Sequence, residues 1–108
     1  MRKQAISRKS VQQLDYTEIR KAALILRAVN HKLRQQIIGL LEENEKMTVT
    51  SLYIRLRLEQ SVASQHLAIL RRAGVVTTER QGKFIYYRVD PDAMKRVDIG
   101  VKIILPND

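Results

Sequence analysis

Cysteine is absent from the chain, so disulfide bridges, thiolate metal clusters and thiol redox switches are excluded. The two histidines, His31 and His66, are not spaced with carboxylates in the manner of a zinc site. No apolar run approaches the roughly 20 residues of a transmembrane helix, and MRKQAISRKS at the start lacks the apolar segment of a signal peptide. We therefore expect a soluble protein of the cell interior with no metal and no cofactor.

Acidic residues are scarce relative to basic ones: 11 Asp and Glu stand against 20 Lys and Arg, which gives a net charge of +9. This balance favours a polyanionic partner, such as nucleic acid or an acidic membrane face. A length of 108 residues, with 44% hydrophobic and 29% charged residues, is typical of one globular domain with a single modest core. We expect one domain over residues 1–108, with residues 1–10 as a flexible basic arm.

The first predicted helix follows Asp15, which forms a candidate capping box with Glu18, and ends near Val29. Apolar residues occupy nearly all of its circumference, so one small core cannot cover it on every side. Its main stripe is expected to be Ile19, Ala23, Leu26 and Val29, with Leu24 and Ile25 on the other side.

Apolar periodicity predicts three further helices, over residues 31–43, 49–56 and 60–73. Asn30 and Thr48 are the expected N-caps of the first two, and Gly74 is the expected stop of the third. Only Arg57–Glu59 separates the last two helices, which is the spacing of a helix-turn-helix.

From Val75 the apolar period changes to two, so VVTTER and KFIYYRVD, on either side of Gln81-Gly82, predict a two-stranded β-hairpin. Asp90-Pro91 then begins a last helix, expected over 91–106 and apolar on two sides. The fold class is therefore mostly α (α+β): a winged helix-turn-helix of about five helices, with the hairpin wing between the fourth and fifth.

The helix over 60–73 has two contrasting sides. Ala63, Leu67 and Leu70 line up toward the core. The other side carries Ser61, Gln65, Ala68 and Arg72, with Ser64 on the flank. Hydroxyl and amide groups can donate to and accept from base edges, and the small Ala68 permits close approach. We predict that this side enters the major groove of DNA.

Basic residues near this helix are expected to neutralise phosphates: Arg71, Arg72, Arg80 and Lys83. His66 is favoured as a half-buried histidine bonded to its neighbours, although a phosphate contact from its outer nitrogen stays open. The wing carries three aromatic residues, Phe84, Tyr86 and Tyr87. These are expected to pack onto the domain, and a stacking platform for single-stranded bases is the less favoured alternative.

Residues 49–89 resemble the winged helix-turn-helix of bacterial ArsR/SmtB-type repressors. The resemblance lies in S-x-H-L at 64–67, L-R-x-A-G at 70–74 and G-K-x-x-x-Y-R at 82–88. NHKLRQQIIGLLEEN is similar to the second helix of that family, with Arg34 at the place of its usual arginine. The resemblance implies a homodimer formed by the first and last helices. The expected interface is Leu24, Ile25, Met94, Val97, Val101, Ile104 and Leu105.

The chain also departs from that family. Thr48 and Thr50 stand where its metalloid sensors have cysteine, and residues 91–108 lack the histidines of its zinc site, so metal sensing is not expected. Arg57 stands where glycine is common, Glu59 where a serine cap is common, and Gln65 where arginine is frequent, which suggests a different base preference.

The sequence therefore predicts a regulator of transcription that binds double-stranded DNA with sequence specificity, as a dimeric repressor in the bacterial cytoplasm, associated with the nucleoid. The expected DNA-binding residues are Thr48, Gln60, Ser61, Ser64, Gln65, His66, Arg71, Arg72, Arg80 and Lys83. The alternative is a winged helix that docks other proteins without reading DNA. An enzyme is not expected, because no set of reacting residues is recognisable. The sequence does not indicate an effector.

Overall fold

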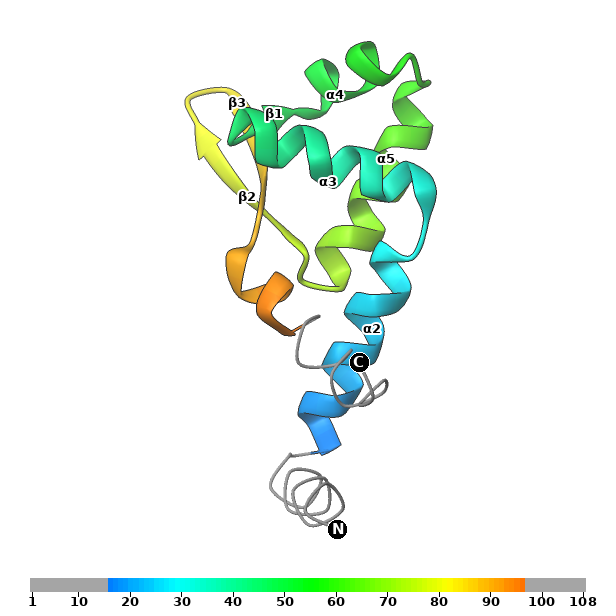
Figure 1. Ribbon diagram of the computed structural model, residues 1–108. Coiled ribbons are helices and arrows are strands. Elements are labelled where there is room, and N and C mark those ends of the chain that lie inside the picture. Colours follow the sequence, from blue (N-terminus) through cyan, green and yellow to red (C-terminus); the bar gives the residue numbers. More distant parts are fainter. Residues whose placement is uncertain (1–15, 97–108) are drawn as a thin grey trace, which may run out of the picture.

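A computed structural model describes residues 16–96 as one mostly helical fold with a small sheet (Figure 1). The hairpin extends from one side of the helical body, and α5 lies on the other side. The elements are α2 (Tyr16–Val29), α3 (Lys32–Asn44), β1 (Met47–Thr48), α4 (Val49–Leu56), α5 (Gln60–Arg72), β2 (Val76–Gln81) and β3 (Phe84–Val89). Residues 91–96 are helical. The predicted cap Asp15, and the rest of the predicted last helix, lie outside the described residues.

Helix α2 packs against α3 and α5 through a face that differs from the predicted one. Its buried residues are Ala22, Ile25 and Ala28. Ile25 is 1% exposed and belongs to the hydrophobic core, so its assignment to the dimer interface is wrong. The helix is apolar nearly all round, so periodicity alone could not choose its inner face. The small Ala22 and Ala28 beside Ile25 let the helix come close to its neighbours.

Helix α3 begins one residue later than the sequence suggested. Its N-cap is His31, whose Nδ1 accepts a hydrogen bond from the Leu33 amide at 3.2 Å, so the expectation that Asn30 caps this helix is wrong. The amide of Asn30 instead donates to the Leu26 carbonyl oxygen, which continues the hydrogen bonding of α2. The chain therefore passes from α2 to α3 with a very short break.

The helix-turn-helix of α4 and α5 is confirmed. Thr48 caps α4, since its Oγ1 accepts from the Ser51 amide. Arg57 ends α4 in the left-handed conformation, with φ 56° and ψ 46°, where glycine would meet no steric cost. Glu59 stands at the N-cap of α5 without a side-chain cap bond. The turn thus has the expected length but is built from residues unusual for it.

Helix α5 lies across the core, and the predicted orientation is confirmed. Ala63, Leu67 and Leu70 are its buried residues. Gly74 follows the helix with φ 81°, as expected for a stop signal, and the chain enters β2 through the buried pair Val75 and Val76. Because the inner face of α5 is held by the core, its opposite face is fixed in direction.

The sheet has three antiparallel strands in the order β1-β3-β2, not the two predicted. β1 pairs Met47 with Tyr87 and was missed, because two residues carry no periodicity. The hairpin turn is Gly82-Lys83, one residue later than expected, since Gln81 pairs with Phe84. Gly82 takes φ 63°, which suits the first central position of a type II′ turn.

A ring contact between two histidines, His31 at the start of α3 and His66 in α5, connects the two helices. The rings of His31 and His66 lie 4.9 Å apart between centroids, tilted by 51°. His66 Nδ1 and Arg34 Nε are buried and have no hydrogen-bond partner within residues 16–96. Burial lowers the pKa of His66 below its usual 6.5, and the neighbouring His31 and Arg34 add to this effect. The folded protein therefore favours neutral His66.

Replacement of Leu70 by alanine tests the packing of α5. Leu70 is 0% exposed, so Leu70→Ala should reduce the free energy of unfolding by about 2–5 kcal/mol. The adjacent Ile69 is 36% exposed and provides a matched control, for which Ile69→Ala should cost less than about 1 kcal/mol. Urea denaturation followed by circular dichroism measures both. Equal losses would show that α5 is not packed as described.

The neutral state of His66 predicts the sign of a pH effect on stability. As pH falls through 6.5, the unfolded chain takes up a proton that the folded chain binds more weakly. The free energy of unfolding should therefore decrease between about pH 7.5 and about pH 5.5. His66→Gln should make this decrease smaller in urea denaturation. An unchanged pH dependence in the variant would contradict the interpretation.

Candidate nucleic-acid interface

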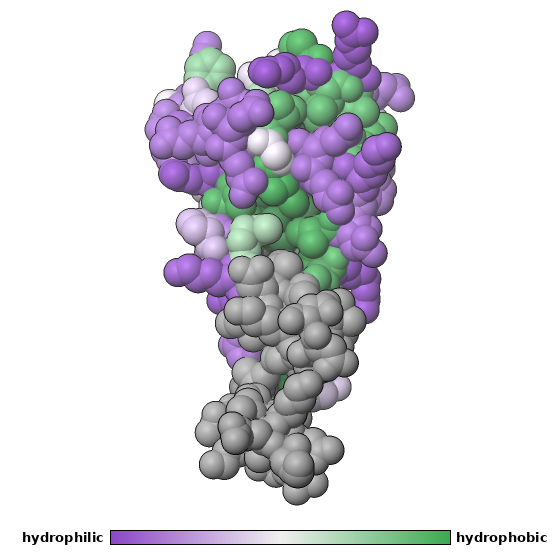
Figure 2. All heavy atoms as spheres, viewed as in Figure 1, coloured by the Kyte–Doolittle hydropathy of each residue, from purple (hydrophilic) through white to green (hydrophobic). Residues whose placement is uncertain are grey.

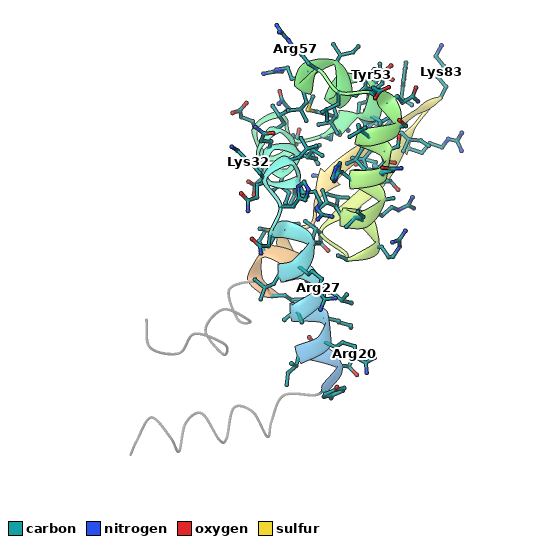
Figure 3. The ribbon with its side chains drawn as sticks, turned by 90° about the vertical axis from the view of Figure 1, so that its right-hand side faces the viewer. Arg20, Arg27, Lys32, Tyr53, Arg57 and Lys83 are labelled. Atoms are coloured by element: carbon teal, nitrogen blue, oxygen red, sulfur yellow. The ribbon has the colours of Figure 1, made fainter. Side chains whose placement is uncertain are left out.

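The outer face of α5 is uncovered by the rest of the described fold. Residues without charge occupy it from its first residue onward, and all are exposed: Gln60, Ser61, Ser64, Gln65 and Ala68. Figure 3 looks onto this side of the molecule. No Lys, Arg, Asp or Glu occurs between Gln60 and Leu70. The helix therefore presents a neutral strip of hydrogen-bonding groups about 15 Å long.

Gln65 lies almost opposite the core-facing line of α5. Its amide has no hydrogen-bond partner within residues 16–96, whereas Gln35 donates to the Val29 carbonyl oxygen at 2.9 Å and Gln81 donates to Glu79 Oε2 at 2.7 Å. An exposed amide without a protein partner is free to donate to and accept from an external group at the same time. This is the pair of functions that a base edge requires.

Exposed basic side chains stand at the C-terminal end of this neutral strip and on the hairpin. Arg71 and Arg72 end α5, and Arg80 and Lys83 lie near the tip of the hairpin. The ion pairs within residues 16–96 use Lys21, Lys46 and Arg88 instead. The four predicted phosphate contacts therefore have no carboxylate partner in that part of the chain. Their charge is available to an anion.

Glu79 forms ion pairs with Lys46 and Arg88, two basic residues that are not among the predicted DNA contacts. Its carboxylate accepts from Lys46 Nζ at 3.2 Å, from Arg88 Nη1 at 3.1 Å and from Gln81 Nε2 at 2.7 Å. The hydrogen bond from Lys46, followed by those from Gln81 and Arg88, holds the pKa of Glu79 below its ordinary value. The network ties the entry of β1 to both strands of the hairpin, so it orients the wing.

Thr48 and His66 differ from the other predicted contacts, since both are half-buried. Thr48 Oγ1 accepts from the Ser51 amide and donates to Ser51 Oγ at 3.1 Å. His66 contacts His31, as described above. Their contact with DNA stays a prediction, while a structural role for each is visible in the fold.

Two basic residues that the sequence analysis did not select lie next to the N-terminal end of α5. Arg55 is in the last turn of α4 and Arg57 is in the connecting turn, and both are exposed. In Figure 3, Arg57 and Lys83 project from the same end of the molecule. The signal in the sequence was the basic pair flanking Leu56, immediately before the predicted recognition helix.

The predicted dimer residues are only partly described. Leu24 is 46% exposed on α2, and Met94 is half-buried. Val97, Val101, Ile104 and Leu105 lie outside the described residues. Figure 2 shows hydrophobic residues gathered in the middle of one face of the molecule, between hydrophilic residues on both sides.

Two features are absent from residues 16–96. No group of three or more His, Cys, Asp and Glu side chains there could hold a metal ion. No helix of that part is both long enough and apolar enough to cross a bilayer.

Comparison with known proteins places the helix-turn-helix in one family. Residues 31–78 match the family described as bacterial regulatory protein, arsR family. The transcriptional activator HlyU of Vibrio cholerae serotype O1 is 40% identical over 75 residues, which cover 69% of this chain and 68% of that protein.

Solved structures agree with this assignment. HlyU from Vibrio cholerae superposes with a TM-score of 0.65 and 31% identity, covering 83% of this chain and 97% of that chain. The transcriptional repressor PagR of Bacillus anthracis superposes with a TM-score of 0.69 and 30% identity, covering 79% and 98%. The chain therefore belongs to the ArsR family of bacterial regulatory proteins and is a DNA-binding regulator of transcription.

Proposed function

We propose that the protein is a dimeric repressor in which each α5 reads one half of a pseudo-palindromic operator in the major groove. A recognition helix of this kind places its N-terminal residues on base edges, and a two-fold axis sets the half-sites about 34 Å apart. Gln60, Ser61, Ser64 and Gln65 are the proposed base-reading residues. The protein would then act in the bacterial cytoplasm, at the nucleoid.

The neutral face of α5, together with exposed cations that have no carboxylate partner within residues 16–96, is the observation that carries this proposal. Phosphate contacts supply most of the affinity and base contacts supply the specificity. Arg71, Arg72, Arg80 and Lys83 are the proposed phosphate contacts, and Arg55 and Arg57 join them from the other end of the helix. A scaffold for protein docking would not need this separation of neutral and basic groups.

The proposed dimer surface is the side of α2 that the core leaves uncovered. Tyr16, Ile19 and Leu24 are large apolar side chains exposed there. Water contact with such groups is unfavourable, and a second copy of the chain would remove it. Met94 and the predicted C-terminal residues complete this proposed surface. PagR, which resembles this chain, is named a transcriptional repressor, and this supports repression as the outcome of binding.

Selection of bound duplexes from a random pool tests the proposed reading of DNA. We expect a pseudo-palindrome with half-sites one helical turn apart. Affinity for the selected site should fall on the order of 10³-fold between about 50 and about 200 mM salt if at least about six phosphates are contacted. A flat salt response would contradict binding through the backbone.

The double variant Ser61→Ala with Gln65→Ala separates base reading from phosphate binding. The two residues carry no charge, so we expect the variant to lose preference for the selected site and to keep the salt dependence. Fluorescence anisotropy with selected and scrambled duplexes measures both properties. Unchanged preference would favour the docking alternative.

Leu24→Asp tests the proposed dimer. A carboxylate in an apolar interface is strongly unfavourable, so we expect dissociation to monomers in sedimentation velocity and weaker binding to the two-half-site operator. Ile54→Asp places the same charge on another exposed apolar residue, in α4, and should remain dimeric. A wild-type monomer that binds a single asymmetric site would refute the dimer.

A further inference from the structure

The tip of the hairpin exposes two large apolar side chains. Phe84 is 51% exposed and Ile85 is 48% exposed, next to the Gly82-Lys83 turn. The sequence analysis expected the hairpin aromatics to pack onto the domain. Tyr87 packs against the core and Tyr86 is half-buried beneath Lys46, whose Nζ lies 5.0 Å from the ring centre, so both follow that expectation. Phe84 does not.

The position of Phe84 in the hairpin prevents the fold from covering it. Phe84 pairs with Gln81 at the end of the ladder, and its ring centre lies 6.4 Å from that of Tyr86. Ile85 pairs with Arg80 and points to the opposite face, because side chains alternate along a strand. The two faces of the tip therefore each carry one exposed apolar residue.

Cations lie on both faces of the apolar tip, and the carboxylate of Glu79 lies next to Gln81 on the face of Phe84. Lys83 Nζ lies 5.6 Å from the centre of the Phe84 ring, and Arg80 Nε donates to the Gly82 carbonyl oxygen at 3.3 Å. Glu79, the acidic residue of this hairpin, is engaged by Lys46 and Arg88. A partner that covers the tip must therefore also accept the positive charges of Lys83, beside Phe84, and of Arg80, on the face of Ile85.

A DNA minor groove meets both requirements. Its walls are lined by phosphates, and its floor exposes the apolar faces of base pairs once a step is unstacked. A tight two-residue turn is narrow enough to approach a groove about 6 Å wide. The hairpin tip and the start of α5 lie toward the same end of the molecule, on opposite sides of the helical body (Figure 1).

We propose that Phe84 acts as an apolar wedge that enters the minor groove beside the α5 site, partly unstacks one base step and bends the duplex. Lys83 and Arg80 bind the phosphates on the two sides of the groove, and Ile85 packs on the sugars of its wall. This inference rests on the proposed reading of DNA by α5. The wing would contact DNA through an apolar side chain and not through hydrogen bonds to base edges. Its sequence preference would then come from how easily a base step is deformed.

The experiment uses the full chain and the selected duplex, extended by flanking DNA. Fluorescent 2-aminopurine, placed in turn at each flanking step, reports unstacking, and energy transfer between labelled duplex ends reports bending. Wild type should increase the 2-aminopurine signal at one step and bend the duplex by about 20° or more. Phe84→Ala should abolish both signals and weaken binding about tenfold.

Matched variants separate the wedge from other roles of the tip. Phe84→Leu retains an apolar wedge and should keep part of the bend. Lys83→Ala should reduce the salt slope by about one, whereas Phe84→Ala should leave it unchanged. Melting temperatures should match wild type, since the side chain is exposed.

Unchanged bending and unstacking in Phe84→Ala would overturn the wedge. A loss of self-association in Phe84→Ala would overturn it as well, because Phe84 would then be a contact between two copies of the chain. Sequence-specific, salt-dependent binding by a wild type that leaves the duplex straight and stacked would refute the wedge alone. No binding to any duplex would refute the proposed function also.

Discussion

The attachment of α5 to the core is the constraint on which the interface depends. Ala63, Leu67 and Leu70 are buried at one side of the helix, and every uncharged polar residue of interest lies on the other. Because these three side chains are closely packed, the helix cannot rotate without exposing them. The direction in which Gln65 points is therefore a consequence of core packing, although Gln65 itself contributes nothing to the core.

Electrostatics then divide the basic residues of the molecule into two groups. Lys46 and Arg88 are held by Glu79, where they connect β1 with the hairpin and orient the wing. The arginines at the ends of α5 and the cations of the hairpin tip have no such partner within residues 16–96. Net charge alone indicates a polyanionic partner, but this division shows which cations can meet it.

The sequence predicted the order of elements well because each depends on local signals. The change of apolar period at Val75, the Thr48 cap and the Gly74 stop are properties of short segments, and each was confirmed. The misassigned inner face of α2 and the missed strand β1 had no local signal. A helix that is apolar all round shows no preferred side, and a two-residue strand exists only because β3 lies beside it.

The candidate site shows the same contrast between features with a local sequence signal and features that depend on tertiary contacts. The sequence by itself determined that helix 60–73 has a neutral polar side, because helical spacing fixes which residues share a face. Only the tertiary structure decided that Glu79 captures Lys46 from 33 residues away, that Ile25 is buried in the core and that Phe84 is left uncovered at the wing tip. Pairing and burial depend on which segments meet in space, and the spacing of residues along one element does not contain that information.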